Sequence, residues 1–272
     1  MIRVNGVASN VAPVTDRGFA YGDGVFRTLR TTDGRPQHWL RHYAKLASDC
    51  ARLEIACPDR DLLLAEVVST AAALPECAVK VIITRGGGER GYRIPPQANP
   101  TRVVIASPLP QYPVEYFVRG VALFPCRLIL SAQPALAGVK HLNRLENVMA
   151  RAEWDDPRYA EGLLQDDRGN AIGGTMSNLF IVEGNTLYTP DLSRCGVAGV
   201  TRERVMEAAR RQGMKCISQA LEVDRVSAAD EVFVVNSLIG AWPVCAIGTV
   251  AIRTGDVTVR VQEWLDGPEA DD

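Results

Sequence analysis

The chain has 272 residues, of which 47% are hydrophobic and 23% charged, enough to bury a large core and form two modest α/β domains. The formal net charge is -2 and no stripe of basic residues stands out in the sequence, which argues against a nucleic-acid partner. No apolar run reaches the roughly 20 residues that a membrane span needs, and the first residues lack a signal-peptide core. Seven scattered cysteines form no CxxC pair, a pattern typical of reduced thiols. We therefore expect a cytoplasmic protein.

The first 107 residues alternate between strand and helix patterns. Apolar residues recur at helical spacing from Trp39 to Leu53, and a glycine-rich stretch at 85–91 separates two apolar runs. The expected strands are 2–4, 25–30, 79–83 and 102–106, and the expected helices are 39–53 and 59–74.

Three prolines at 108–113 prevent a regular strand ladder there and indicate a linker. The expected domains are therefore 1–107 and 114–272. In the second domain we expect strands at 121–124, 127–130 and 231–236, hairpins at 161–172 and 179–189, and helices at 142–154 and 201–212.

Lys140 lies in the run AGVKHLNRLEN at 137–147, where small and apolar residues precede it and a polar helical pattern follows. Partial desolvation of an amine disfavours its charged form, lowers its pKa and increases the fraction of nucleophilic free amine. Such a lysine can form a Schiff base. The local pattern alone also fits a surface lysine that buries its stem and keeps its charge in water.

The lysine run resembles the cofactor-lysine segment of 4-amino-4-deoxychorismate lyases. These belong to the pyridoxal-phosphate family that includes branched-chain and D-amino acid aminotransferases. Each matching segment is weak alone, but their order and spacing are specific and span nearly the whole chain. The others are DRGFAYGDGVF at 16–26, TRG and RGY within 84–92, TMSNLF at 175–180 and GVAGVTR at 196–202.

This resemblance implies a two-domain α/β fold of fold type IV, with pyridoxal 5′-phosphate between the domains and Lys140 in the C-terminal domain as its catalytic residue. It implies a homodimer that converts a small-molecule substrate, 4-amino-4-deoxychorismate, to 4-aminobenzoate and pyruvate for folate synthesis. Lys140 would hold the cofactor, yield it to the substrate amine and then transfer the proton. Asn143 fits the lyase and D-amino acid aminotransferase pattern, whereas branched-chain enzymes carry a tyrosine at the place of Leu145.

A phosphate site is expected where residues 199–201 enter a predicted helix, because unpaired N–H groups and the helix dipole favour an anion there. Thr201 adds a hydroxyl donor, although helix capping alone also explains a threonine. The pair Asn236 and Ser237 closes a buried strand, and an ordinary strand exit is its alternative. The resemblance assigns the cofactor contacts, besides Lys140, to Gly199, Val200, Thr201, Asn236, Ser237, Asn178 and Lys45.

Two positions depart from the family pattern. Relatives bind the phosphate with an arginine in a His-x-x-Arg-Leu motif, where this chain has Lys45. Lysine keeps the positive charge but cannot form the two parallel hydrogen bonds of an arginine. A lysine at this position also fits the solvated face of a helix. Relatives carry a glutamate that pairs with the pyridine nitrogen five residues before Asn178, where this chain has Gly173. The missing acid favours a lyase, because formation of an aromatic product supplies part of the driving force.

The carboxylates of the substrate are best bound by arginines, whose guanidinium groups donate two parallel hydrogen bonds. Arg85, Arg90 and Tyr92 of the glycine-rich loop supply two guanidinium groups and a ring, although a mobile surface hairpin has the same pattern. Arg27 stands where relatives commonly have an acidic residue, on a strand whose alternation directs it towards the substrate.

No metal site is expected, because His38 and His42 lack an HExxH motif and fit a packed helix. The sequence thus predicts a pyridoxal-phosphate-dependent lyase. Two alternatives stay open: a D-amino acid or branched-chain aminotransferase, and a weakened relative that binds cofactor or a partner without efficient catalysis.

Overall fold

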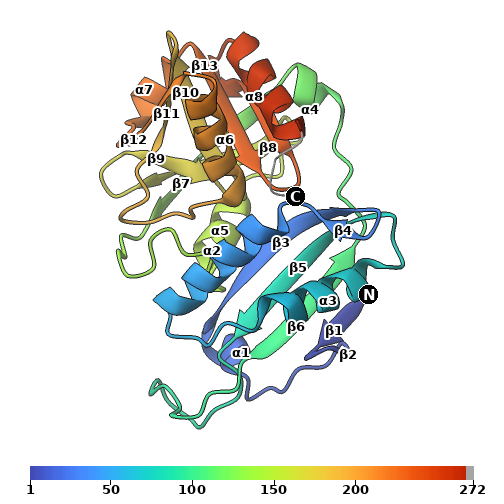
Figure 1. Ribbon diagram of the computed structural model, residues 1–272. Coiled ribbons are helices and arrows are strands. Elements are labelled where there is room, and N and C mark those ends of the chain that lie inside the picture. Colours follow the sequence, from blue (N-terminus) through green and yellow to red (C-terminus); the bar gives the residue numbers. More distant parts are fainter. Residues whose placement is uncertain (268–272) are drawn as a thin grey trace. The chain divides into compact units, whose positions relative to one another are not determined.

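The computed structural model describes residues 1–267, which form two compact units (Figure 1). The first unit contains residues 1–111 and 139–143, and the second contains 112–138 and 144–267. The sequence analysis expects Lys140 in the C-terminal domain, whereas its segment is grouped with the first unit. The physical reason is that this segment pairs through its backbone with a strand of that unit.

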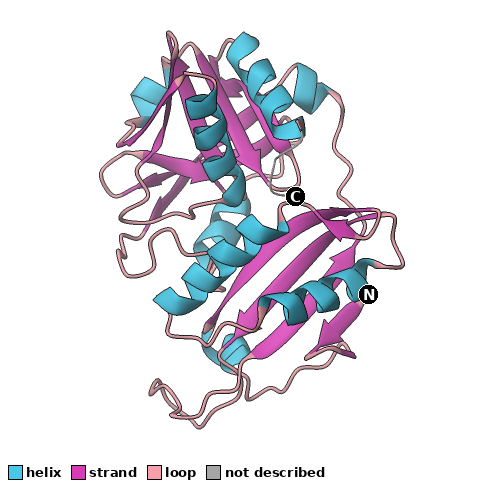
Figure 2. Ribbon diagram, in the orientation of Figure 1, coloured by secondary structure: helices cyan, strands magenta, loops and turns pink. Residues whose placement is uncertain are grey.

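An antiparallel sheet with the strand order β2-β1-β6-β5-β3-β4 forms the base of the first unit. Helices α2 and α3 cover one face of it (Figure 2). The elements are β1 (Ile2–Val4), β2 (Val7–Ala8), α1 (Arg17–Tyr21), β3 (Gly24–Thr32), β4 (Arg35–Pro36), α2 (Trp39–Arg52), α3 (Arg60–Ala71), β5 (Glu76–Thr84) and β6 (Thr101–Ser107).

Alternation along the strands explains why the helices pack on one face. On β3, Val25 and Leu29 are fully buried, whereas Phe26 between them is half-buried and faces the opposite side. Leu46 of α2 and Leu63 of α3 complete the same core cluster. The position of Phe26 matters for the lysine described below.

The second unit has a mixed sheet with the strand order β12-β11-β10-β13-β14-β7-β8-β9, and β15 pairs with β14. Its strands are β7 (Val121–Leu130), β8 (Tyr159–Asp166), β9 (Ala171–Gly174), β10 (Asn178–Glu183), β11 (Thr186–Pro190), β12 (Lys215–Gln219), β13 (Glu231–Asn236), β14 (Gly240–Ile247) and β15 (Val250–Ala251). Its helices are α4 (Glu115–Val118), α5 (Leu145–Arg151), α6 (Val200–Arg211), α7 (Val223–Ser227) and α8 (Asp256–Asp266).

The central strands of this sheet are buried on both faces. Phe180 and Phe233 stack with ring centroids 5.0 Å apart and pack against α6 and α8. On the other face, three aromatic rings from residues 112–117 meet Trp242 edge-on, with centroids 4.7 to 6.0 Å away. The core around Phe180 and Phe233 therefore holds α6, and with it the predicted phosphate segment, against the sheet.

Most elements predicted from periodicity are present, with three differences. The strands expected at 121–124 and 127–130 are one strand, β7, whose register against β8 shifts beyond Pro125. The helix expected over 142–154 is only α5, because residues 140–142 are extended along β3. The periodicity gave no prediction for α1, β2, β4, α4, β12 and α7 or for any element beyond Asn236, where the structure has β14, β15 and α8.

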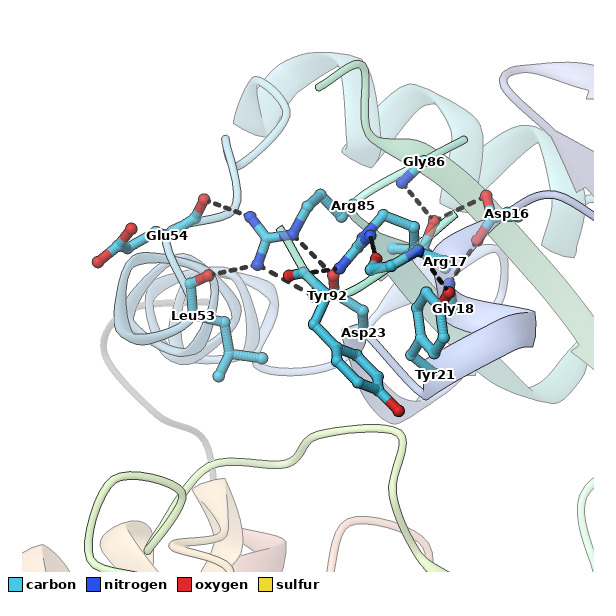
Figure 3. Close-up of polar contacts among 12 residues, drawn as sticks. Asp16, Arg17, Gly18, Tyr21, Asp23, Leu53, Glu54, Arg85, Gly86 and Tyr92 are labelled. Atoms are coloured by element: carbon cyan, nitrogen blue, oxygen red, sulfur yellow. Dashed lines mark hydrogen bonds and ion pairs between the residues drawn. The ribbon is translucent and has the colours of Figure 1, made fainter. Parts of the chain in front are cut away.

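A partly buried carboxylate joins three segments of the first unit (Figure 3). Asp23 accepts hydrogen bonds from Arg17 Nε at 2.8 Å and from Arg85 Nε and Nη2 at 2.8 and 3.0 Å. The remaining donors of Arg85 bond the carbonyl oxygens of Leu53 and Glu54, just after α2. Burial alone would raise the pKa of Asp23, but the bonds from Arg85 and Arg17 outweigh it and lower the pKa below 3.8.

We predict that Arg85→Met lowers the free energy of unfolding by about 3–5 kcal/mol, because it removes two of the three side-chain bonds to Asp23 and the donors of two carbonyl oxygens. Urea denaturation at neutral pH measures the change. A carboxylate with a depressed pKa stabilises the fold above its unfolded pKa and loses this effect as the pH falls through the folded one. The difference between the two proteins should therefore shrink below pH 3.8.

The matched control is Arg90→Met, which removes an exposed arginine of the same loop and should change the free energy of unfolding by no more than about 0.5 kcal/mol. Equal losses in the two variants would contradict the stabilising role of the Asp23 cluster.

Candidate active site

Lys140 sits in an extended segment at the edge of the first unit's sheet. Its carbonyl oxygen accepts from the N–H of Phe26 at 3.0 Å, and the N–H of Leu142 donates to the carbonyl of Gly24 at 2.9 Å. His141, between them, forms an antiparallel bridge with Val25. The lysine backbone is therefore fixed by strand-type hydrogen bonds, unlike that of a mobile surface loop.

The side chain of Lys140 lies on the half-buried face of β3. Its Nζ is 4.5 Å from the centroid of the Phe26 ring, and the Nζ of Lys80 on β5 is 4.7 Å from the same centroid. An aromatic ring attracts a nearby ammonium group and covers it from water on one side. The amine is thus partly shielded, as the residues around it predict.

Lys45 and Arg27 meet at one carboxylate that the sequence analysis did not single out. Asp49, on α2, is almost completely buried and forms ion pairs with both side chains. Arg27 points to the face of β3 that α2 covers, so its guanidinium is committed to Asp49. The expected substrate role of Arg27 does not agree with this placement, because the alternation of β3 directs Arg27 into the core.

The predicted substrate residues of the glycine-rich loop differ in exposure. Arg85 is buried and all of its nitrogens donate within the chain, so it is a structural residue of the Asp23 cluster and not an available fork. Arg90 is exposed, and Tyr92 is 85% exposed with its ring 5.3 Å from that of Tyr21. Only Arg90 and Tyr92 present side chains outward.

In the second unit, the start of α6 brings two predicted phosphate residues together. Thr201 is in the first turn of the helix, and its Oγ1 lies 3.3 Å from Oγ of Ser237, which follows β13. Gly199 caps the helix without a side-chain bond, so the first N–H groups point forward with the positive end of the dipole. Two hydroxyls and a helix N-terminus therefore converge on one place, which suits an anion.

Asn178 and Asn236 hold the loops around this place. Asn178 donates to the carbonyl of Val197 at 2.7 Å and accepts from the N–H of Gly199 at 3.1 Å. A Cβ at Gly199 would lie 2.3 Å from Oδ1 of Asn178, so a larger residue here would displace the amide of Asn178. Asn236 accepts from the N–H groups of Leu238 and Ile239. Both asparagines are occupied by backbone groups and shape the loops.

Gly173 occupies the position where the family resemblance predicts a glutamate. A carboxylate from the neighbouring strand β8, that of Glu161, lies close to this turn. Glu161 on β8 is buried and accepts from the N–H of Thr175 and of Met176 and from the hydroxyls of Thr175 and Ser177, at 2.5 to 3.1 Å. These four donors fix the turn between β9 and β10. A Cβ on Gly173 would lie 2.8 Å from the carbonyl oxygen of Ser177, so this turn is closed over the glycine.

Among residues 1–267, no group of three or more His, Cys, Asp or Glu side chains is arranged to hold a metal ion. Within the same residues, no helix combines the length and the apolar character that crossing a membrane requires.

Comparison with known proteins agrees with this architecture. A model of the family described as amino-transferase class IV matches residues 24–247. The chain is 34% identical to an aminodeoxychorismate lyase from Vibrio harveyi, over 98% of this chain and all of that protein. It is 30% identical to a putative branched-chain-amino-acid aminotransferase from Methanocaldococcus jannaschii, over 92% and 88% of the two chains.

Among solved structures, 4-amino-4-deoxychorismate lyase from Pseudomonas aeruginosa is 44% identical, with a TM-score of 0.94 over 97% of this chain and 98% of that one. The branched-chain amino acid aminotransferase of Escherichia coli, 23% identical, shares the fold with a TM-score of 0.86. These matches confirm the predicted α/β fold of type IV. The chain belongs to the class IV aminotransferases, a family of pyridoxal-phosphate-dependent enzymes.

Proposed function

We propose that this protein is a pyridoxal-phosphate-dependent lyase that converts 4-amino-4-deoxychorismate to 4-aminobenzoate and pyruvate in folate synthesis. The observation that carries the proposal is the nearly full-length similarity to the Pseudomonas aeruginosa lyase. The missing acid at Gly173 agrees with a reaction that gains an aromatic product and depends less on the cofactor ring.

Pyridoxal phosphate, when bound, supplies an aldehyde that condenses with amines and a ring that withdraws electrons from the attached carbon. We propose that Lys140 holds it covalently and that Lys45 adds a positive charge for its phosphate. The N–H groups of residues 199–201 and the hydroxyls of Thr201 and Ser237 fit a phosphate by charge and donor chemistry. Asn178 and Asn236 shape that site through the backbone.

Lys140 is also the proposed proton carrier. With the cofactor bound, the free amine of Lys140 would take the proton from the amine-bearing ring carbon of the substrate. The fixed backbone and the Phe26 ring hold this amine in one place, which favours proton transfer over a short, defined path.

For the substrate we retain Arg90 as a donor to a carboxylate and Tyr92 as a ring that stacks on the substrate. Their support is their outward placement on the glycine-rich loop. Arg27 and Arg85 are left out of this proposal because their guanidinium groups are buried and bond carboxylates of the chain itself, whereas Lys45 is partly exposed.

We further propose that the protein is a cytoplasmic homodimer. All seven cysteines are free thiols, which agrees with a reducing compartment. The homodimer rests on the family resemblance, and light scattering of the purified protein decides it.

We predict that borohydride reduction of the protein with its cofactor fixes a pyridoxyl group on Lys140, as peptide mapping by mass spectrometry will detect. Lys140→Ala should abolish the adduct and lower the rate by about 10³-fold or more, because it removes both the covalent holder and the proton carrier. Lys80→Ala is the matched control, since Lys80 contacts the same ring. An adduct on Lys80 in the unaltered protein would overturn the assignment.

We predict that Thr201→Val weakens cofactor binding by ~1–3 kcal/mol, because valine keeps the shape of threonine and loses the hydroxyl. Equilibrium titration followed by cofactor absorbance measures the affinity. Thr70→Val is the control: this buried threonine of α3 bonds only the carbonyl of Glu66, so its loss should change stability and leave affinity unchanged. Unaltered affinity in Thr201→Val would place the phosphate elsewhere.

We predict that the purified protein releases 4-aminobenzoate and pyruvate in equal amounts from 4-amino-4-deoxychorismate without any added keto acid. Chromatography of both products over time tests this. An aminotransferase would need a keto-acid acceptor and would give no aromatic product, so such a result would favour the D-amino acid or branched-chain alternative. Cofactor binding without either reaction would identify the weakened relative.

A further inference from the structure

Asp49 connects three separate pieces of the first unit. Its Oδ2 accepts from the main-chain N–H of Lys140 at 3.2 Å and from Arg27 Nη2, and its Oδ1 accepts from Lys45 Nζ. These partners come from the lysine segment, from β3 and from α2 itself, where Lys45 is four residues earlier. Only 1% of Asp49 is exposed, so these charges interact with little screening by water.

The contact with Lys140 complements the bonds that this residue makes to β3. Phe26 holds the carbonyl of Lys140 from the side of the strand, and Asp49 holds its N–H. The peptide groups before and after the Lys140 Cα are thereby both fixed. The direction in which the side chain leaves the backbone follows from these two bonds, and it brings Nζ over the Phe26 ring.

Asp49 also sets the charge around the lysine. Its negative charge stands against the cations Arg27 and Lys45, so its removal leaves an excess of positive charge beside Lys140. A neighbouring cation disfavours the protonated form of an amine, and a neighbouring anion favours it. The titratable and charged groups on the elements packed against the segment are His42, Lys45 and Asp49 from α2, Arg27 from β3, Lys80 from β5, and His141 beside the lysine.

We propose that Asp49 is a positioning residue for the reactive lysine: it anchors the backbone of Lys140 and, balanced by Arg27, sets the charge that the Lys140 amine experiences. The covalent role of Lys140 rests on the proposed function, whereas the link between Asp49 and the amine does not require it. In this arrangement the arginine at position 27 and the aspartate at position 49 act as a matched pair.

The test measures the reactivity of the amine directly. The full-length protein is freed of carbonyl compounds with hydroxylamine, dialysed and labelled with a low concentration of acetic anhydride at several pH values. Mass spectrometry then gives the labelling rate of the Lys140 peptide, with other lysines as internal references. Only the unprotonated amine reacts, so the rate at neutral pH reports the free fraction.

Asp49→Asn keeps the shape and an oxygen acceptor for the Lys140 N–H but removes the charge. We expect the labelling rate of Lys140 at pH 7 to rise roughly threefold to tenfold, the effect of losing one buried charge that is bonded to the main chain of the same residue. Arg27→Gln should lower the rate, because it removes a cation. The double variant removes one charge of each sign and should return the rate towards that of the unaltered protein.

Glu66→Gln is the matched control, because Glu66 is also a buried carboxylate of the first unit and pairs with an arginine of another strand, Arg102 on β6. It should change thermal stability without changing the labelling of Lys140. The double variant also covers the case in which Asp49→Asn alone does not fold.

A purely structural Asp49 would lower the melting temperature in Asp49→Asn and leave Lys140 labelling unchanged, which would overturn the proposal. A shift of the two single variants in the same direction would overturn it as well. A failure of the proposed function is distinct: no pyridoxyl adduct would then form on Lys140, while the opposite effects of the two single variants on labelling would persist.

Discussion

The short antiparallel pairing between residues 140–142 and β3 is the constraint on which the site depends. Two backbone hydrogen bonds and the bridge from His141 to Val25 make the lysine segment part of a sheet edge. Because neighbouring side chains on a strand point to opposite faces, this pairing puts Lys140 on the side of Phe26 and away from the helices. A one-residue slip would turn the amine into the helix-covered core.

Carboxylates shared between two cations recur in the first unit. Asp23 bonds Arg17 and Arg85, and Asp49 bonds Arg27 and Lys45. Removing one cation of such a group leaves the carboxylate with only one partner, and removing the carboxylate leaves two cations side by side. Either change costs several kcal/mol where the charges are buried. This explains why arginines that look available for a substrate carboxylate in the sequence have another role in the folded chain. Recognition of the substrate is then left to residues at the surface of the loop.

The sequence predicted those parts of the site that depend on local pattern. Small residues before a polar helix point to Lys140, and glycine before a helix start points to Thr201; the family resemblance adds their roles, which stay predictions. The contacts of Asp49 join residues 22 and 91 positions apart, and Arg85 meets Asp23 from 62 positions away. No periodicity within a segment reports such pairs. The spacing of Lys45 and Asp49, four residues apart on one helix, was the available signal.

The same distinction applies to the fold. Strands with strict alternation, such as β3, and helices with one apolar face, such as α2, follow from the residues themselves. The predicted helix over 142–154 was too long, because pairing of residues 140–142 with a strand more than a hundred residues earlier overrides their local preference.

The grouping of residues 139–143 with the first unit means that, within the described residues, the chain passes from one unit to the other three times. The units are therefore interleaved along the gene. A fragment that ends at residue 111 lacks the segment that completes the edge of its own sheet at β3. If two related genes recombined at one breakpoint between the units, the reactive lysine would come from one parent and the strand that supports it from the other. Recombination within this family therefore conserves the site only where both parents share the contacts of β3 and α2.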